Sequence, residues 1–542
     1  MNYIKAIRIH GYKKFEKFEV KFQPGLNILI GENSAGKSTI LEAIEIVLNQ
    51  ATFKYDYSQL ESLLNKTMVE TFLTSQKHLA DELPSIEIEV FFNFETNPKF
   101  APFFGEQFSE FNSKKPTSFF GIKFNFEFDK DFLDEFEKID FSDKSQRVIP
   151  LEYYHSSWRT FRGDPYVSRM NPLHSLLIDN SRYMYDLYGS YAKRIFNLQV
   201  EKNQQRQASY AFKQSMISAL NDNEDKISLS RAHQRFTINQ RKAQLADLID
   251  ISEDDIPLQN MGKGKESLVK TELSLDSKAS LVMIEEPENH LSYSNTRKMI
   301  AQINSQSDNA QQVIVTTHES MVLNRLNLDH AIWIRDSKGE SLESLSDADA
   351  EFFKRNDDFD ILKFILADKV ILVEGASEYI TVPAITKKVL GKDLDELGIS
   401  VLSLHGIHYK HFFDLAERLN KRVLILTDND GSKNEHIDEQ NAETADNIYI
   451  QTPSDPDIFT FEVALDQVNH KLTEEYRAAY HPKSKSTSYK KEYTNLDKAL
   501  ACALANKTEF AIYIAEQFEK NDSGVLSPAY IEEGLKWLQR LN

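Results

Sequence analysis

The sequence predicts an α/β protein built from two successive units. Two observations indicate this: a short apolar strand, a glycine loop and a helix near the N-terminus, and a β-α-β-α-β alternation from 369 to 430. Strands that alternate with helices are typical of parallel sheets covered by helices. A chain of 542 residues is also too long for one hydrophobic core, so we expect at least two domains.

Strands and helices of the first unit follow from local periodicity. A helical pattern covers 38–48, and from about 172 to 250 the chain is polar and helical. This second region could be an inserted arm that serves dimerisation, or simply a solvated helix pair. Strand-like runs occur at 3–9, 18–22, 26–30, 86–92, 122–126, 281–284 and 313–316.

The loop after strand 26–30 has the pattern of a phosphate-binding loop. Residues 31–38 read GENSAGKS, which matches G-x-x-x-x-G-K-[ST] between a strand and a helix. The glycines let backbone N–H groups surround a phosphate, and the helix N-terminus adds partial positive charge. Lys37 is expected to reach the β- and γ-phosphates of ATP, and the Ser38 hydroxyl to ligate Mg²⁺. The nucleotide-binding residues expected here are Asn33, Gly36, Lys37, Ser38 and Thr39.

Acidic residues after strand 281–284 supply the second half of a nucleotide site. Glu285 would act on the metal through water, and Glu286 would orient the water that attacks the γ-phosphate. His318, at the end of strand 313–316, could contact the γ-phosphate. An exposed acidic turn is the alternative for the two glutamates, and a structural histidine is the alternative for His318.

Three carboxylates follow strands of the second unit. Glu374 follows strand 369–373, and Asp428 and Asp430 follow strand 422–427. A further predicted strand, 399–404, lies between these two in the sequence. Ligands bind at the carboxyl ends of such strands, and converging carboxylates favour Mg²⁺ or Mn²⁺. Turn chemistry, or a fragment of a calcium loop, is the alternative interpretation of Asp-Asn-Asp-Gly.

Three motifs of the first unit together resemble the ABC-type ATPases of the RecF and SMC group. They are GENSAGKST, IEEPENHL and VTTHES. The resemblance implies an ATP site shared between two heads, so the chain is expected to be at least a homodimer. Gly262 and Gly264 are the best local match to the loop that would cap the γ-phosphate of a partner. This loop lacks the common serine-glycine-glycine form, and Glu285 replaces the usual Asp, which leaves open whether ATP is hydrolysed or only bound.

VEGASE followed by LTDNDG resembles the Toprim domain of topoisomerases, primases and nucleases. An ABC-type ATPase followed by a Toprim domain resembles the overcoming-lysogenization-defect (OLD) nuclease family, which is similar to antiphage-defence nucleases of Gabija or retron systems. The resemblance implies an ATPase domain at 1–355 and a Toprim domain with C-terminal helices at 356–542. It also implies that Lys507 stabilises charge on the scissile phosphate, and that the metal ligands are Glu374, Glu378, Asp428, Asp430 and Glu462.

Composition limits the remaining choices. A net charge of −19 excludes a general positive coat for nucleic acid, and fits either a soluble surface or a carboxylate-rich metal site. The single cysteine, Cys502, excludes an internal disulfide and is typical of the reducing cytoplasm. The sequence contains no run of eighteen apolar residues, so we expect no transmembrane helix. The basic stretch 481–491 could track DNA phosphates or be a simple surface loop.

The sequence therefore predicts an ATP-gated, metal-dependent DNA endonuclease. The family resemblance implies antiphage defence with an operon-encoded partner, such as a helicase or a retron reverse transcriptase with its RNA–DNA hybrid. One alternative is a RecF-like repair ATPase whose Toprim domain binds partners without cutting. Another is a topoisomerase-like enzyme, which would need a nucleophilic tyrosine on a separate helical domain.

Overall fold

The computed structural model divides the chain into two compact units, Met1–Glu343 and Ser344–Asn542. This division lies at the start of the acidic stretch 344–360, about a dozen residues before the domain boundary expected after residue 355. Helix α10 (Asp347–Arg355) therefore belongs to the second unit. The structure describes residues 2–50, 61–94, 97–108, 111, 113–143, 147–179, 190–223, 227, 229, 234–240, 243–306, 311–335, 337–342, 347–356, 359–406, 408–429, 437, 440–441, 444–489, 494–520 and 524–540.

Twelve strands of the described residues form one mixed sheet in the first unit. Their order is β5-β6-β4-β1-β2-β14-β13-β3-β12-β11-β8, and β7 pairs with β6. The antiparallel part buries a core rich in phenylalanine and isoleucine against helix α1 (Lys37–Asn49). Its strands are β1 (Tyr3–Tyr12), β2 (Phe15–Lys21), β4 (Ile86–Asn93), β5 (Phe104–Phe108), β6 (Pro116–Phe128) and β7 (Tyr154–Thr160).

The nucleotide-binding motifs lie on the other half of this sheet. β3, β11 and β12 are buried along their whole length, which explains why they read as continuous apolar runs. They are parallel to one another, so their carboxyl ends share one edge. The strands of this half are β3 (Leu26–Ile30), β8 (Leu176–Asp179), β11 (Leu281–Glu285), β12 (Gln312–Thr316), β13 (Ala331–Arg335) and β14 (Lys338–Ser341).

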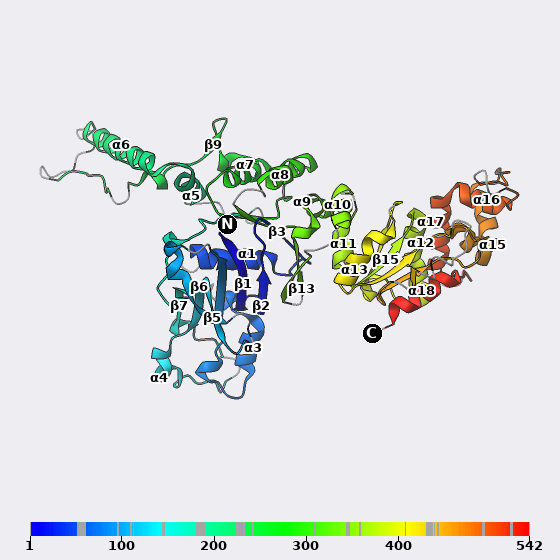
Figure 1. The fold of residues 1–542 in the computed structure, drawn as a ribbon, viewed down its shortest axis with the longest axis horizontal. Helices are drawn as coiled ribbons and strands as arrows, with labels where there is room; N and C mark the ends of the chain where they lie inside the picture. Colours follow the sequence, from blue (N-terminus) through cyan, green and yellow to red (C-terminus); the bar gives the residue numbers. More distant parts are fainter. Residues whose placement is uncertain are drawn as a thin grey trace. The chain divides into compact units, whose positions relative to one another are not determined.

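Helices flank this half, and one pair extends from it. α7 (Lys263–Leu275) and α8 (Tyr293–Gln306) lie side by side, and α9 (Ser320–Leu326) follows β12 (Figure 1). α5 (Ser190–Gln199) and α6 (Lys202–Asn221) form the arm, and every residue of α6 is at least partly exposed. Two shorter helices, α3 (Lys66–Thr74) and α4 (Leu133–Phe136), lie near the antiparallel strands.

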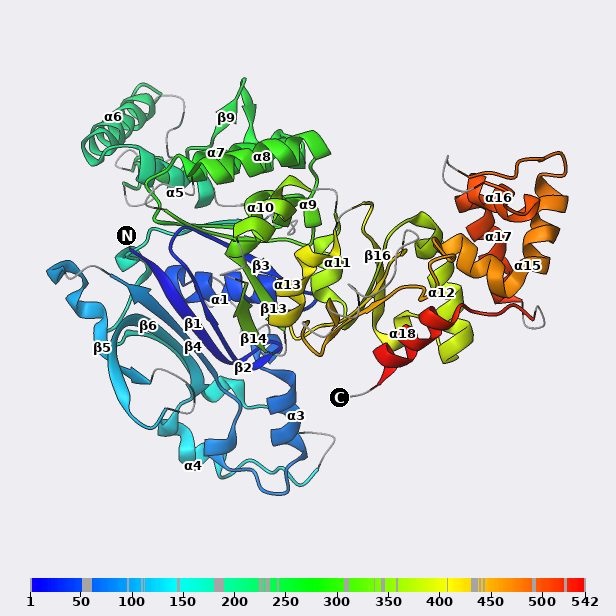
Figure 2. The same cartoon turned by 45° about the vertical axis from the view of Figure 1, so that its right-hand side comes forward.

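The second unit contains a four-stranded, wholly parallel sheet in the order β16-β15-β17-β18. The strands are β15 (Lys369–Val373), β16 (Ile399–Ser403), β17 (Arg422–Leu426) and β18 (Ile448–Gln451). Figure 2 shows this sheet with α12 (Ala376–Leu390) and α18 (Ala529–Gln539) beside it. The other helices are α11 (Ile361–Leu366), α13 (Phe413–Arg418), α15 (Phe461–Tyr480), α16 (Lys498–Ala505) and α17 (Lys507–Glu519).

The structure confirms the expected α/β class, with a first unit that carries a mixed sheet and a helical arm, and a second unit with a parallel sheet followed by helices. One detail was wrong. Residues Leu176–Asp179, expected within the polar helical region, form strand β8 beside β11. Among the described residues, no helix is both long and apolar enough to cross a bilayer.

Candidate functional site

The phosphate-loop lysine lies at the centre of the expected nucleotide site. Its Nζ donates to the carbonyl oxygens of Gly31 at 2.8 Å and Glu32 at 3.1 Å. Gly36, just before α1, has φ 103, and a Cβ there would lie 2.3 Å from the Phe15 ring. Only glycine meets both conditions, because other residues rarely adopt this backbone conformation and would also clash. The loop therefore folds as its sequence pattern predicts.

Burial lowers the pKa of Lys37, while the carboxylates of Glu286 and Glu288, and more weakly Glu285, act to raise it. The phosphate-loop lysine and the acidic residues after β11 therefore act on one another electrostatically. This is the arrangement that a Mg²⁺–nucleotide site needs, with a cation for the phosphates and carboxylates for the metal ion and its waters. Of the other loop residues expected to bind nucleotide, Asn33 and Ser38 are exposed and Thr39 is half-buried.

The two glutamates after β11 differ in their environments. Glu285 is the last residue of the strand, is buried, and lies opposite Thr316 of β12. Glu286 has φ 44, and its N–H donates to the carbonyl and the hydroxyl of Thr316 at 3.0 and 3.1 Å. A glutamate in the left-handed region costs about 1 kcal/mol or more, so this turn is held by its surroundings. It directs the Glu286 side chain away from the strand direction, toward His318 and Asn289.

A third acidic residue, Glu288, joins the ends of β11 and β12. Its Oε1 accepts from the Thr317 hydroxyl at 2.8 Å and from the His318 N–H at 3.0 Å. The His318 Nδ1 lies 3.3 Å from the same oxygen and 3.5 Å from Glu286 Oε1. Sequence reasoning missed Glu288, although it belongs to the quoted IEEPE run. Its partners are about thirty positions away, and no local pattern connects them.

The two glycines expected to face a partner subunit have different surroundings. A Cβ at Gly264 would lie 2.5 Å from the His290 carbonyl oxygen, so glycine there lets α7 approach the loop after β11 closely. Gly262 precedes α7, is exposed, and has open space where a Cβ would lie. Packing within the chain thus explains why residue 264 is a glycine, but it does not explain the glycine at 262. Contact of either glycine with a partner's nucleotide stays a prediction.

Acidic residues of the second unit meet at the carboxyl edge of its sheet. Glu374 follows β15, and its Oε2 accepts from the Asp428 N–H at 3.1 Å and the Thr427 hydroxyl at 3.2 Å. Asp428 follows the neighbouring strand β17, and its Oδ1 accepts from the Phe461 N–H at 2.9 Å. These bonds tie together two strand ends and the first turn of α15.

Helix N-termini contribute the remaining members of the cluster. Glu378 lies in the first turn of α12, and its Oε2 is 3.4 Å from the position a Cβ would take on Gly375. Glu462 lies in the first turn of α15 and is 1% exposed. Lys507 begins α17, and its Nζ lies 2.6 Å from Glu462 Oε2. Thus Glu374, Glu378, Asp428, Glu462 and Lys507, here called the acidic cluster, come together from separate parts of the sequence.

The carboxylates of the acidic cluster repel one another, and this repulsion affects their pKa values. Burial, with the charges of Glu378, Glu374 and Glu462, raises the pKa of Asp428 to about 8. Burial likewise raises the pKa of Glu378 to about 7, helped by Glu462 and Glu374. Burial alone would lower the pKa of Lys507, but the negative charge of Glu462 raises it overall. The acidic cluster therefore contains more carboxylates than its one lysine can neutralise.

The donor chemistry of the acidic cluster fits a divalent cation, because oxygen ligands suit Mg²⁺ and Mn²⁺ and a cation would relieve the repulsion. In the described part of the chain, no three His, Cys, Asp or Glu side chains already have the geometry to ligate one ion. Asp430, also expected to be a ligand, lies outside the described residues. The residue types of the acidic cluster thus suit a divalent cation, and metal binding by these residues stays a prediction.

The raised pKa values predict how the metal-free protein responds to pH. Free carboxyl groups titrate near pH 4, whereas folded Asp428 and Glu378 keep their protons to about pH 8 and 7. Between these limits the folded state binds more protons, so its stability falls as pH rises. In chelator, we expect Asp428→Asn to melt at least about 5 °C above the unchanged protein at pH 8.5, with a much smaller gap at pH 5. A gap that is the same at both pH values in thermal unfolding would contradict this.

Comparison with known proteins adds two family matches. Residues 2–322 match the family model described as AAA ATPase domain, and residues 365–430 match the Toprim domain of overcoming-lysogenization-defect-like proteins. These domains in general use a nucleotide and a divalent metal ion. Each match lies within one of the two structural units.

Three individual proteins illustrate the similarity. Endonuclease GajA of Bacillus cereus (strain HuB5-5) is 21% identical over 685 aligned positions, which cover 99% of each chain. The C-terminal region of the OLD protein from Xanthomonas campestris pv. campestris is 25% identical, covering 33% of this chain and 94% of that one, with a TM-score of 0.24. The Smc head domain derived from Pyrococcus furiosus is 13% identical, covering 66% and 100% of the two chains, with a TM-score of 0.33.

Proposed function

Since this chain belongs to the family of AAA ATPase domains and continues into an OLD-like Toprim domain, we propose that it is an ATP-binding endonuclease that cuts DNA with Mg²⁺ or Mn²⁺. The observation that carries the proposal is the acidic cluster, in which two strand ends and three helix N-termini direct charged side chains to one place. A structural role alone does not account for four neighbouring carboxylates, of which Glu378 and Glu462 are buried, because their repulsion costs stability.

The members of the acidic cluster divide into two groups in this proposal. Glu374, Glu378 and Asp428, together with Asp430, would hold the cation, which would activate water and stabilise the leaving oxygen when bound. The Glu374 carboxylate is held in place by the Asp428 N–H and the Thr427 hydroxyl. Lys507, held by Glu462, would face the negative charge that develops on the scissile phosphate.

The basic segment beside the acidic cluster supports DNA as the substrate. Lys507 Nζ lies 5.7 Å from the centre of the Tyr489 ring, and His481 Nε2 lies 2.8 Å from Glu509 Oε2 on α17. The described part of the basic stretch, 481–489, is therefore anchored next to Lys507 at both ends. Its lysines could contact the DNA backbone on either side of the cut. Residues 490 and 491 lie outside the described residues.

The ATPase unit would act as a gate. Lys37, Ser38, Glu285, Glu286 and His318 would bind the nucleotide and its Mg²⁺, and Gly262 and Gly264 of a second copy would complete the site. A composite site of this kind requires at least a homodimer, and we place this homodimer or larger homo-oligomer in the cytoplasm as part of the proposal. The biological setting we propose is antiphage defence with an operon-encoded partner, such as a helicase or a retron reverse transcriptase, as the resemblance to the OLD family implies.

The test is cleavage of supercoiled plasmid by the purified full chain. With Mg²⁺ or Mn²⁺ we expect nicked and linear products, at a rate that changes when ATP is added, and no products in chelator. Protein purified together with its operon partners is tested in parallel. If neither preparation cuts any DNA with either metal, the endonuclease proposal is wrong. The RecF-like alternative predicts that outcome, together with ATP-dependent loading onto DNA and full tolerance of Glu374→Ala.

A further inference from the structure

The Lys507 ammonium stands at the end of a long, flexible side chain. A lysine stem has four carbons and many rotamers, so a single contact does not fix the position of the charge. One contact is the ion pair with Glu462, whose Oε2 lies 2.6 Å from the Nζ. The Lys507 side chain is nevertheless 33% exposed, so part of it is open to solvent. Whether the ammonium keeps one position therefore depends on a second contact.

The ring of Tyr489 supplies a second contact. The Lys507 Nζ lies over this ring, 5.7 Å from its centre, which is within the range at which an aromatic face attracts an ammonium group. The attraction arises from the quadrupole of the ring, so the ring holds the cation without cancelling its charge. A second carboxylate would also hold the ammonium, but it would leave less positive charge for a phosphate. The ring is thus suited to fixing a lysine that must still attract an anion.

Apolar packing fixes the Tyr489 ring in turn. The ring packs against a small hydrophobic cluster that surrounds the Lys507–Glu462 ion pair in the sequence. Two members of this cluster lie close to Glu462 at the start of α15, and the other two lie on α16, which ends just before Lys507. The four members are Phe459, Val463, Leu500 and Leu504. The ring and the ion pair are therefore supported by the same helices.

The loop that carries Tyr489 is also held by contacts that do not involve the lysine. Arg477 of α15 donates from Nη1 to the Ser484 carbonyl at 3.4 Å. The Leu496 N–H donates to the Thr487 carbonyl at 2.8 Å, two residues before the tyrosine. The position of the ring is thus set by its own surroundings, and the ring can act as a support for the ammonium.

We propose that Tyr489 is a positioning residue for Lys507, whose ring holds the ammonium beside Glu462 so that it faces the scissile phosphate. The inference rests on the function proposed above, because it assumes that Lys507 acts on that phosphate. Misplacing a reacting group by about 1 Å can cost about 100-fold in rate, so a support of this kind affects catalysis. A tyrosine that only filled the apolar cluster could be replaced by leucine with no change at Lys507.

The experiment compares Tyr489→Phe with Tyr489→Leu and Tyr489→Met in the full chain. Phenylalanine keeps an aromatic face, whereas leucine and methionine keep an apolar side chain and remove that face. Labelling of the Lys507 amine by an N-hydroxysuccinimide ester is followed by mass spectrometry in chelator. The kcat and KM for plasmid cleavage in Mg²⁺ are measured separately. Thermal unfolding checks the fold, and the methionine variant keeps the test decisive if leucine disturbs it.

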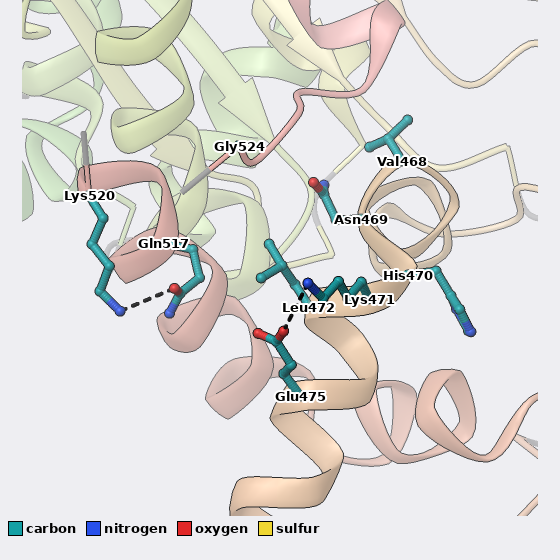
Figure 3. Close-up of a pocket in the computed structure, with 9 residues that line it drawn as sticks. All are labelled: Val468, Asn469, His470, Lys471, Leu472, Glu475, Gln517, Lys520 and Gly524. Carbon is teal, nitrogen blue, oxygen red and sulfur yellow. Dashed lines mark hydrogen bonds and ion pairs between the residues drawn. The ribbon is translucent and has the colours of Figure 1, made fainter. Parts of the chain in front are cut away.

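Lys471 and Lys520 are internal controls for the labelling. Figure 3 shows both lysines at a hollow of about 510 Å³. The Lys471 Nζ lies 3.9 Å from Glu475 Oε1, and the Lys520 Nζ donates to Gln517 Oε1 at 3.1 Å. Each of them, like Lys507, thus has an oxygen partner close to its amine. Their labelling rates should be the same in all variants, because their partners do not change.

We expect Lys507 to be labelled about threefold or more faster in the leucine and methionine variants, and within about twofold of the normal rate in Tyr489→Phe. In the same two variants kcat should fall about tenfold or more with KM for DNA unchanged, because the ammonium and not the DNA is misplaced. Unchanged labelling of Lys507 without the ring would overturn the inference, and so would a phenylalanine variant that behaves like leucine. If no form of the protein cuts DNA, the proposed function fails, yet the labelling still decides whether Tyr489 holds Lys507.

Discussion

Asp428→Asn is expected to abolish DNA cleavage while leaving the metal-free protein as stable as before, or more so. The two effects have opposite signs because the proposed task of the carboxylate is to hold the metal ion, whereas its negative charge is unfavourable in the metal-free fold. Without a cation, Asp428 is repelled by Glu378, Glu374 and Glu462, and this repulsion contributes to its pKa of about 8. An amide removes that repulsion, and its oxygen can still accept from the Phe461 N–H.

Cleavage should fall by about 1000-fold or more, because stabilisation by a bound metal ion is worth several kcal/mol in the transition state. The measurement is the initial rate of plasmid nicking in Mg²⁺, with thermal unfolding in chelator on the same preparations. Asp414→Asn, in α13 and outside the acidic cluster, is the matched control. A variant that cuts at more than a tenth of the normal rate would refute the assignment of Asp428 as a metal ligand.

Lys37→Met is expected to remove ATP binding with little effect on folding. The Lys37 ammonium is buried, and this burial lowers its pKa, so methionine of similar length relieves a desolvation cost. The loss falls on the nucleotide, because charged hydrogen bonds to phosphate contribute about 1.5–3 kcal/mol each. Two such bonds correspond to at least about a 100-fold loss of ATP affinity.

Binding of a fluorescent ATP analogue to the full chain measures this effect. Lys17→Met is the control, since Lys17 is an exposed lysine on β2 of the same unit. If ATP gates the nuclease, the Lys37 variant should also lose the response of plasmid cleavage to ATP while keeping the metal-dependent rate. Unchanged nucleotide affinity would place the ATP site elsewhere.

Local sequence patterns predicted the parts of the structure that depend on neighbouring residues. The strands at 26–30 and 369–373 were predicted with the bounds that the structure shows, because each is a buried apolar run beside a glycine turn. β8 was missed because its four residues lie within a polar, helical stretch, and only its pairing with β11 makes it a strand.

In the candidate metal site as well, local patterns predicted some residues, whereas others depend on contacts between distant parts of the chain. Glu374 and Asp428 could be predicted from parallel-sheet geometry, since both follow apolar strands. Glu462 and Lys507 were assigned through family resemblance alone; the structure joins their side chains in a 2.6 Å ion pair, and their roles stay predictions.

The carboxylate of Glu288 has a consequence for communication between subunits. It joins His318, at the expected γ-phosphate position, to the loop that contains His290, and that loop's backbone rests on Gly264 of α7. Only short contacts separate the nucleotide histidine from a helix whose N-terminus is exposed at Gly262. These contacts connect His318 with the start of α7, the part of the chain proposed to face the nucleotide of a second copy.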